Sequence, residues 1–181
     1  MANMNNNQKN NTKLLIILLA LVTLAAICVT VWALFFRKPD VVLAPDYAPQ
    51  ETEANAEAIP DDSGDKMDAP EGGGAVSLIY MTDVTIDLSD KSATLMFGNP
   101  QKSTQDMVVQ IVVKDTVIAQ SGKLTPGNRV TTLDLLADAP KLGAGTYTSE
   151  NCKFVVLYYN QESGEKAILN TEIPITVTVQ E

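Results

Sequence analysis

The feature that most constrains this chain is an apolar run from Leu14 to Phe36, 23 residues without a charged side chain. A helix over this run would be apolar on every side, as a helix surrounded by lipid is. At about 1.5 Å per residue it would extend roughly 34 Å, enough to cross a hydrocarbon core of about 30 Å. The run therefore predicts one transmembrane helix, with membrane lipid as its partner.

A cleaved signal peptide and a lipoprotein signal are the two alternatives to a permanent anchor. A signal peptide has an apolar region of about 7 to 15 residues followed by a small-residue cleavage site. This run is longer, and it ends in aromatic residues such as Trp32, followed by Arg37 and Lys38. Residues 24–28 read LAAIC, which ends in a cysteine as a lipoprotein signal does. The apolar run continues beyond Cys28, however, which argues against that signal. Aromatic and basic residues at its end favour an uncleaved anchor.

The charges are distributed unevenly along the chain. Residues 1–38 hold four basic and no acidic residues, residues 39–75 hold one basic and ten acidic residues, and residues 76–181 hold eight basic and twelve acidic residues. This acidic exterior argues against nucleic acid and anionic lipid as partners, because both require clustered Lys and Arg.

Two lysines precede the run and two basic residues follow it, so the count of flanking positive charges is close to a tie and the orientation is inferred from the layout instead. A short polar tail, an anchor and a long C-terminal part are typical of a signal anchor. We therefore expect residues 1–13 in the cytoplasm and the C-terminal domain on the extracytoplasmic side of the cell membrane.

Residues 37–75 are rich in Pro, Ala, Gly and acidic residues and have few large apolar side chains. Such a composition predicts a disordered linker, here one that holds a domain roughly 30 to 37 Å from the membrane. Asp61, Ser63 and Asp65 have the alternating spacing that begins a calcium loop. Lys66 stands where that loop needs glycine, and no Glu stands at the twelfth position. We expect a solvated acidic run and no metal site.

From Val76 onward, short β-rich runs alternate with turn residues. The pattern predicts an all-β, immunoglobulin-like antiparallel β-sandwich of about seven to eight strands over residues 76–181. The expected strands cover 76–81, 84–88, 92–97, 107–113, 116–120, 130–135, 152–159 and 167–179, the last broken around Pro174.

Leu142, Gly145 and Tyr147 have the Leu-x-x-Gly-x-Tyr spacing of a tyrosine corner, in which the Tyr hydroxyl bonds to backbone a few residues upstream. We expect that bond near Leu142 or Gly143, although Tyr147 could instead be a simple core aromatic. The domain has no tryptophan and no cysteine partner for Cys152. It therefore resembles the wide immunoglobulin-like class and not antibody domains.

A narrower resemblance rests on the anchor, the DDSGDK segment, FGNPQKSTQDMVVQIVVKD, SGKLTPGN and FVVLYYNQESGEKAILNTEIPITVTV. In these features the chain resembles a group of uncharacterised single-span, membrane-anchored proteins of gut Firmicutes. The resemblance covers most of the chain. It implies a bacterial cell surface, and it brings no activity and no catalytic residue.

The sequence offers little for catalysis, because it contains no histidine and Cys152 has no base of the usual kind to activate it. Carboxylates at Asp83, Asp87 and Asp90, or at Glu162 and Glu165, could form an acid–base pair for glycoside cleavage, but they fall at predicted strand ends and turns, where solvated acids are common. We expect no catalytic residue and no cofactor. A non-catalytic protein-interaction or adhesion module is the first hypothesis, and a small extracytoplasmic hydrolase or protease-inhibitor domain acting at the cell wall is the alternative.

Two of the predicted strands, 107–113 and 152–159, carry apolar residues on both faces, whereas the last strand has Thr176 and Thr178 on its outer face. In 107–113, 152–159 and the last strand, one alternating set is apolar enough to face the core. If these strands share a sheet, the other set forms an outward apolar patch for a surface protein or a second copy, namely Val108, Val112, Val155, Leu157 and Tyr159. The alternative is that a loop such as 136–146 covers the patch and makes it part of the core.

Overall fold

A computed structural model describes residues 4–36, 43–137, 139 and 142–181, and within the N-terminal helix it describes the side chains of 13–31. The chain divides into two compact units, Met1–Val42 and Leu43–Glu181. Each unit is described by itself. The predicted flank of Trp32, Arg37 and Lys38 lies outside the described side chains.

The first unit contains helix α1, Met4–Phe36. Its segment Lys13–Val31 is long and apolar enough to cross a membrane, and no part of it is buried against protein. The two hydroxyls in the run bond to the helix's own carbonyls, Thr23 to Leu19 and Ala20, and Thr30 to Ala26 at 2.8 Å. Neither hydroxyl of the apolar run therefore needs a partner outside the helix, which is what a lipid environment requires.

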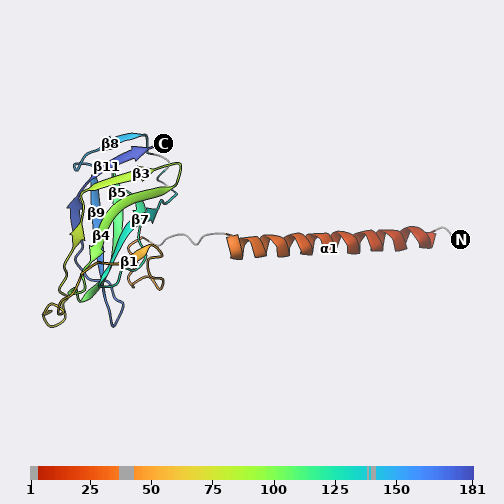
Figure 1. The fold of residues 1–181 in the computed structure, drawn as a ribbon. Coiled ribbons are helices and arrows are strands. Elements are labelled where there is room, and N and C mark those ends of the chain that lie inside the picture. Colours follow the sequence, from red (N-terminus) through yellow and green to blue (C-terminus); the bar gives the residue numbers. More distant parts are fainter. Residues whose placement is uncertain (1–3, 37–42, 138, 140–141) are drawn as a thin grey trace. The chain divides into compact units, whose positions relative to one another are not determined.

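The second unit is a sandwich of two β-sheets, so the predicted all-β sandwich after one helix is confirmed (Figure 1). Sheet I has the order β1-β7-β4-β3-β11-β8, with β2 also paired to β4, and sheet II has the order β10-β9-β5-β6. The strands are β1 Ala56–Ala58, β2 Ile79–Tyr80, β3 Asp83–Asp87, β4 Ser92–Asn99, β5 Gln105–Val113, β6 Thr116–Gln120, β7 Asn128–Asp134, β8 Gly145–Tyr147, β9 Cys152–Asn160, β10 Thr171–Pro174 and β11 Thr176–Gln180. The immunoglobulin-like topology stays a prediction, and one pair departs from an antiparallel sandwich because β11 runs parallel to β3.

The last predicted strand breaks at Pro174, as expected, but its two halves lie in different sheets. β10 pairs with β9 in sheet II, whereas β11 pairs with β3 and β8 in sheet I. Proline has no N–H to continue the ladder. Ile175 still donates to the Cys152 carbonyl, and the next N–H, of Thr176, donates across to Thr82. The expectation that the whole segment neighbours β9 in one sheet is therefore wrong beyond Pro174.

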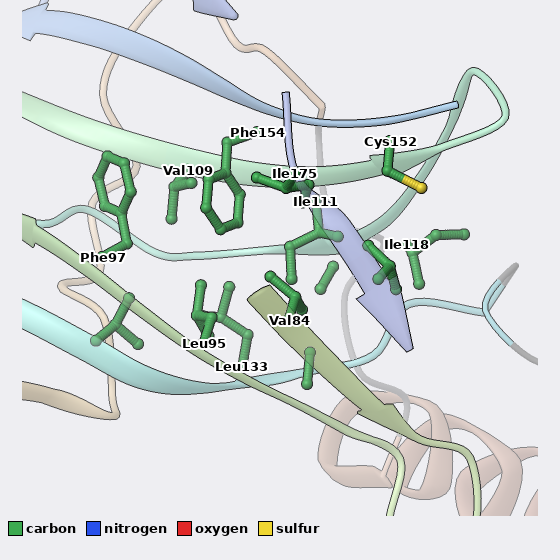
Figure 2. Packing of buried hydrophobic residues seen from close by; sticks show 14 of the residues in the cluster. Val84, Leu95, Phe97, Val109, Ile111, Ile118, Leu133, Cys152, Phe154 and Ile175 are labelled. Carbon is green, nitrogen blue, oxygen red and sulfur yellow. The ribbon is translucent and has the colours of Figure 1, made fainter. Parts of the chain in front are cut away.

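The core lies between the sheets and contains the residues that alternation placed there. The inward sets of β5 and β9, such as Val109, Ile111 and Phe154, are fully buried, and so are Ile175 and the inward residues of β11 (Figure 2). The rings of Phe97 and Phe154 meet edge to face with centroids 5.8 Å apart. This pairing joins the two sheets at the centre of the core.

The β5–β6 hairpin has a two-residue turn, since Val113 pairs with Thr116. Both turn residues have positive φ, 48° at Lys114 and 62° at Asp115. That combination is the one a type I′ turn requires, and it matches the twist of the flanking strands. The predicted reversal at Lys114-Asp115 is present.

The predicted disordered linker is wrong for most of its length, because the compact second unit begins at Leu43. We call residues 43–75 the strap. It pairs with sheet I through β1 and β7, and it bonds to loops through Glu53 to Lys123, Ile59 to Gly127 and Met67 to Lys102. Composition argued against folding because few large apolar side chains are present. The strap instead docks through main-chain hydrogen bonds to strands and loops that are already fixed.

Candidate functional site

The predicted outward patch on sheet II is not exposed, which corrects the sequence interpretation. Val108, Leu157 and Tyr159 form a second buried cluster with 0%, 1% and 0% of their surface exposed, and Val112 is buried as well. Val155 is half-buried at the edge of this cluster. These side chains point away from the main core, as predicted, but they do not meet solvent.

The strap covers this face, not the loop over 136–146. Ala44 and Ala48 pack on the second cluster, and the Tyr159 hydroxyl donates to the Pro45 carbonyl at 3.1 Å. In the described part of the loop, Ala139 and Leu142 pack on the main core. The apolar outer face of sheet II is therefore buried, because the strap, a segment distant in sequence, covers it.

Hydrogen bonds fix the strap at both edges of sheet II. At one edge the Ala48 N–H donates to Gly164 and the Lys166 N–H donates to Asp46. At the other edge the Gly122 N–H donates to the Glu53 carboxylate at 2.6 Å. The chain crosses the sheet at the end where β5 begins and β9 finishes, which we call the strap end.

The tyrosine-corner residues form the predicted hydrogen bond. The Tyr147 hydroxyl donates to the Gly143 carbonyl at 2.9 Å, and Gly145 has a φ of 142°, a value that favours glycine. Leu142 packs against the main core. The bond is exposed, so its loss would uncover a carbonyl that water can reach, and its contribution to stability is smaller than that of a buried bond.

The candidate catalytic carboxylates lie at the ends of β3, in the turn that follows it and in the chain after β9, and one has a clear structural role. The Asp87 carboxylate accepts hydrogen bonds from the Ser89 N–H and hydroxyl and from the Asp90 N–H. These bonds, led by that from Asp90, lower the pKa of Asp87. Glu162 and Glu165 lie in the β9–β10 hairpin. Across the described residues, no group of three or more His, Cys, Asp or Glu side chains is placed to hold a metal ion.

A hollow of about 360 Å³ lies at the other end of the sandwich, which we call the turn end. Lys114 and Asp115 from the β5–β6 turn and Glu150 and Asn151 from the turn before β9 line it. Glu172 of β10 lines it too, paired with Lys153 of β9 at 3.0 Å. The hollow is thus lined by charged groups of both signs, which lie on two short turns and on the neighbouring strands.

Cys152 lines this hollow, and the Tyr147 ring lies against Lys114 of its lining. The Lys114 ammonium lies 4.8 Å from the centroid of the Tyr147 ring, a cation–π distance. Cys152 is 2% exposed, and burial raises the pKa of its thiol despite the nearby Lys114 charge. A protonated, buried thiol is a poor nucleophile, so the ordinary structural role predicted for Cys152 fits its surroundings.

A wider hollow of about 620 Å³ lies between the glycine-rich segment at 72–74 and the chain from 163 to 171. Ile168 and Leu169 line it and are 100% and 78% exposed, while the Tyr158 hydroxyl on its floor donates to Thr171 at 2.6 Å. The sequence interpretation placed residues 167–179 in one strand and did not detect this exposed apolar pair. The signal was Asn170, a turn residue directly after two aliphatic residues.

No family model and no curated protein matches this chain. Among solved structures, a domain of the outer membrane lipoprotein Omp28 from Porphyromonas gingivalis is similar at 13% sequence identity, over 66% of this chain and 99% of that chain, with a TM-score of 0.34. A likeness at this level transfers neither a function nor a site to this chain.

Proposed function

We infer that this chain is a membrane-tethered, non-catalytic interaction module of a bacterial cell surface, with its β-sandwich outside the membrane. The observation that carries the proposal is the presence of two units in one chain. The first has an apolar helix that is not buried against the described part of the chain, and the second, which starts at Leu43, is a β-sandwich. The resemblance to single-span surface proteins of gut Firmicutes supports the same location.

The turn-end hollow is the region where we place the partner. The strap occupies the other end of the sandwich, whereas the turn end is formed by short loops whose charged side chains reach solvent. Lys114, Glu150 and the Lys153–Glu172 pair offer both signs of charge within one hollow. A polypeptide surface with complementary charges is the kind of partner that such a site selects, because charge arrangement mainly determines specificity and encounter rate.

The test is capture of envelope proteins by the full chain held in vesicles, with charge-reversal variants beside the wild type. Lys114→Glu and Glu150→Lys should each lose the captured partner, because each replaces one charge in the hollow by its opposite. Lys102→Glu makes the same change as Lys114→Glu at an exposed position of the strap end, and it should keep the partner. Equal capture by all three variants would reject the turn end as the binding region.

A further inference from the structure

The domain begins close to the end of α1 along the chain. Six residues, 37–42, separate Phe36 from Leu43. Even fully extended, the seven residue steps between these two positions cover at most about 25 Å. The chain from Phe36 to Leu43 is therefore shorter than the stand-off expected for a free linker of 37–75, and it limits how far the domain can lie from the end of α1.

The surface around Leu43 is apolar and exposed. The strap residues that follow Leu43 pair directly with the hairpin that precedes Ile168, since Tyr47 bridges Glu165 and the Lys166 N–H donates to Asp46. Leu43 is 47% exposed and Tyr47 is 61% exposed.

The β9–β10 loop contributes the most exposed part of this surface. The Ala167 N–H still bonds to Tyr158, and Thr171 pairs again with Val156, so residues 168–170 project from the sheet edge between two fixed points. Ile168 and Leu169 lie at this projection. Single exposed aliphatic residues are common on soluble proteins, but two adjacent ones with almost no cover mark a contact surface.

We propose that Leu43, Tyr47, Ile168 and Leu169 form a membrane-facing rim that inserts into the headgroup region of the bilayer that holds α1. This inference rests on the proposed anchoring. Aliphatic side chains gain by entering the acyl boundary, and tyrosine is favoured at the headgroup level because its ring is apolar and its hydroxyl is polar. The anchor keeps the rim near lipid at all times, so shallow insertion of a few side chains suffices for a stable contact.

The charges near the rim specify the kind of lipid surface. Asp46, Glu162 and Glu165 outnumber Lys166 in this region. The rim therefore has no basic cluster to hold anionic lipid, and its contact is apolar. Insertion should occur in zwitterionic phosphatidylcholine and should change little with salt, because salt screens charge interactions and not the burial of apolar groups.

The experiment places an environment-sensitive fluorophore on a cysteine at the rim of the full chain. Asn170→Cys in a Cys28→Ser background puts the label beside Ile168 and Leu169 without removing them, and Cys152 is too buried to be labelled. Glu150→Cys in the same background is the matched control at the turn end. In phosphatidylcholine vesicles, the label at 170 should shift to the blue and be quenched by a lipid-bound quencher. The label at 150 should do neither, and changing both Ile168 and Leu169 to Asp should abolish the effects at 170.

Three other outcomes would contradict the proposal in different ways. Failure of the chain to float with the vesicles means that α1 is not an anchor, so the proposed function fails as well. Flotation with a label at 170 as unquenched as the label at 150 rejects the rim alone. A blue shift that disappears when each vesicle holds at most one chain assigns the surface to a second copy instead of lipid.

Discussion

At the scale of the residue, the outward side chains of sheet II are buried, although strand alternation alone suggests that they face solvent. Val108, Leu157 and Tyr159 point outward from sheet II, yet they are as buried as the main core. A strand pattern tells which face a side chain lies on, and it does not tell whether another segment covers that face. The apolar character of both faces was the signal that both are covered.

Leu157→Lys tests this burial, and its expected effect is loss of stability and not loss of a partner. The change removes a fully buried side chain and puts a charge beneath the strap, so we expect the free energy of unfolding to fall by about 3 to 5 kcal/mol. Urea unfolding of the variant and the wild type measures it. Glu162→Lys, at an exposed position of the hairpin, is the control and should stay within about 0.5 kcal/mol of the wild type. A Leu157→Lys domain as stable as this control would contradict the buried cluster.

Tyr159 makes the free energy of unfolding of the domain depend on pH in the alkaline range. Burial, with the nearby Asp46 charge, raises the pKa of Tyr159 to about 12, above the ordinary value of 10.0. The unfolded chain therefore loses this proton at a lower pH than the folded chain. The stabilisation is complete below pH 10 and is lost as the pH rises to 12, by about 1.4 kcal/mol per pH unit at most.

The measurement is urea unfolding at several pH values between 9 and 11.5, with Tyr159→Phe beside the wild type. The variant also loses the hydrogen bond to Pro45, so it should be less stable at pH 9. Its stability should then fall less steeply between pH 10 and 11.5, since lysines and the other tyrosines still titrate in both proteins. Parallel pH curves for the two proteins would mean that Tyr159 is reached by water.

At the scale of the element, the strap is the segment whose state determines what the domain presents to solvent. Its docking depends on close approach of two backbones at Gly122, where an added Cβ would lie 3.0 Å from the Glu53 backbone and 3.1 Å from the Thr52 carbonyl carbon. Such distances are tighter than nine in ten Cβ contacts, so the strap backbone would have to move by a few tenths of an ångström to admit a side chain at Gly122. The close docking of the strap is therefore favoured by glycine at a position that lies outside the strap, Gly122.

Gly122→Ala should loosen the strap at this edge while the sandwich stays folded. We expect faster cleavage after Glu51 and Glu53 by a glutamate-specific protease, because the displaced segment becomes accessible. Gly64→Ala, within the strap, meets nothing within 4 Å and should leave the cleavage rate unchanged. If both variants are cleaved alike, the contact at Gly122 does not hold the strap.

At the scale of the whole molecule, the two units meet different surroundings within one chain. The span Lys13–Val31 is not buried against the described part of the chain and is apolar enough to cross a membrane, whereas Leu43–Glu181 completes two buried clusters by itself. These properties fit a single-pass anchor, and the extracytoplasmic side of the domain is the part of the proposal that protease access tests. Protease added to intact protoplasts should then degrade the domain, and a tag on the N-terminal tail should survive.

Permeabilised protoplasts provide the control for that topology, because the protease then reaches both sides of the membrane. The tag and the domain should both be lost in them. A domain that survives in intact protoplasts and is lost only after permeabilisation would reverse the orientation.

The sequence by itself determined the features that depend on local patterns. The apolar run predicted α1, alternation predicted the strands and their core faces, and the residues at Lys114-Asp115 and Pro174 predicted a turn and a break. The spacing of Leu142, Gly145 and Tyr147 predicted a side-chain hydrogen bond that is present. All of these follow from the preferences of neighbouring residues, which act over a few positions.

Only the tertiary structure decided what the acidic segment and the last strand do. The strap is held by main-chain bonds to partners such as Lys123, Gly127 and Gly164, and no side-chain composition reports those bonds. The sequence pattern placed Ile168 and Leu169 in a strand. They project from the sheet instead, because Ala167 before them and Thr171 after them are both paired with β9. Contacts between segments far apart in sequence depend on where the whole chain places them, so the covered face and the exposed rim became visible only in the folded domain.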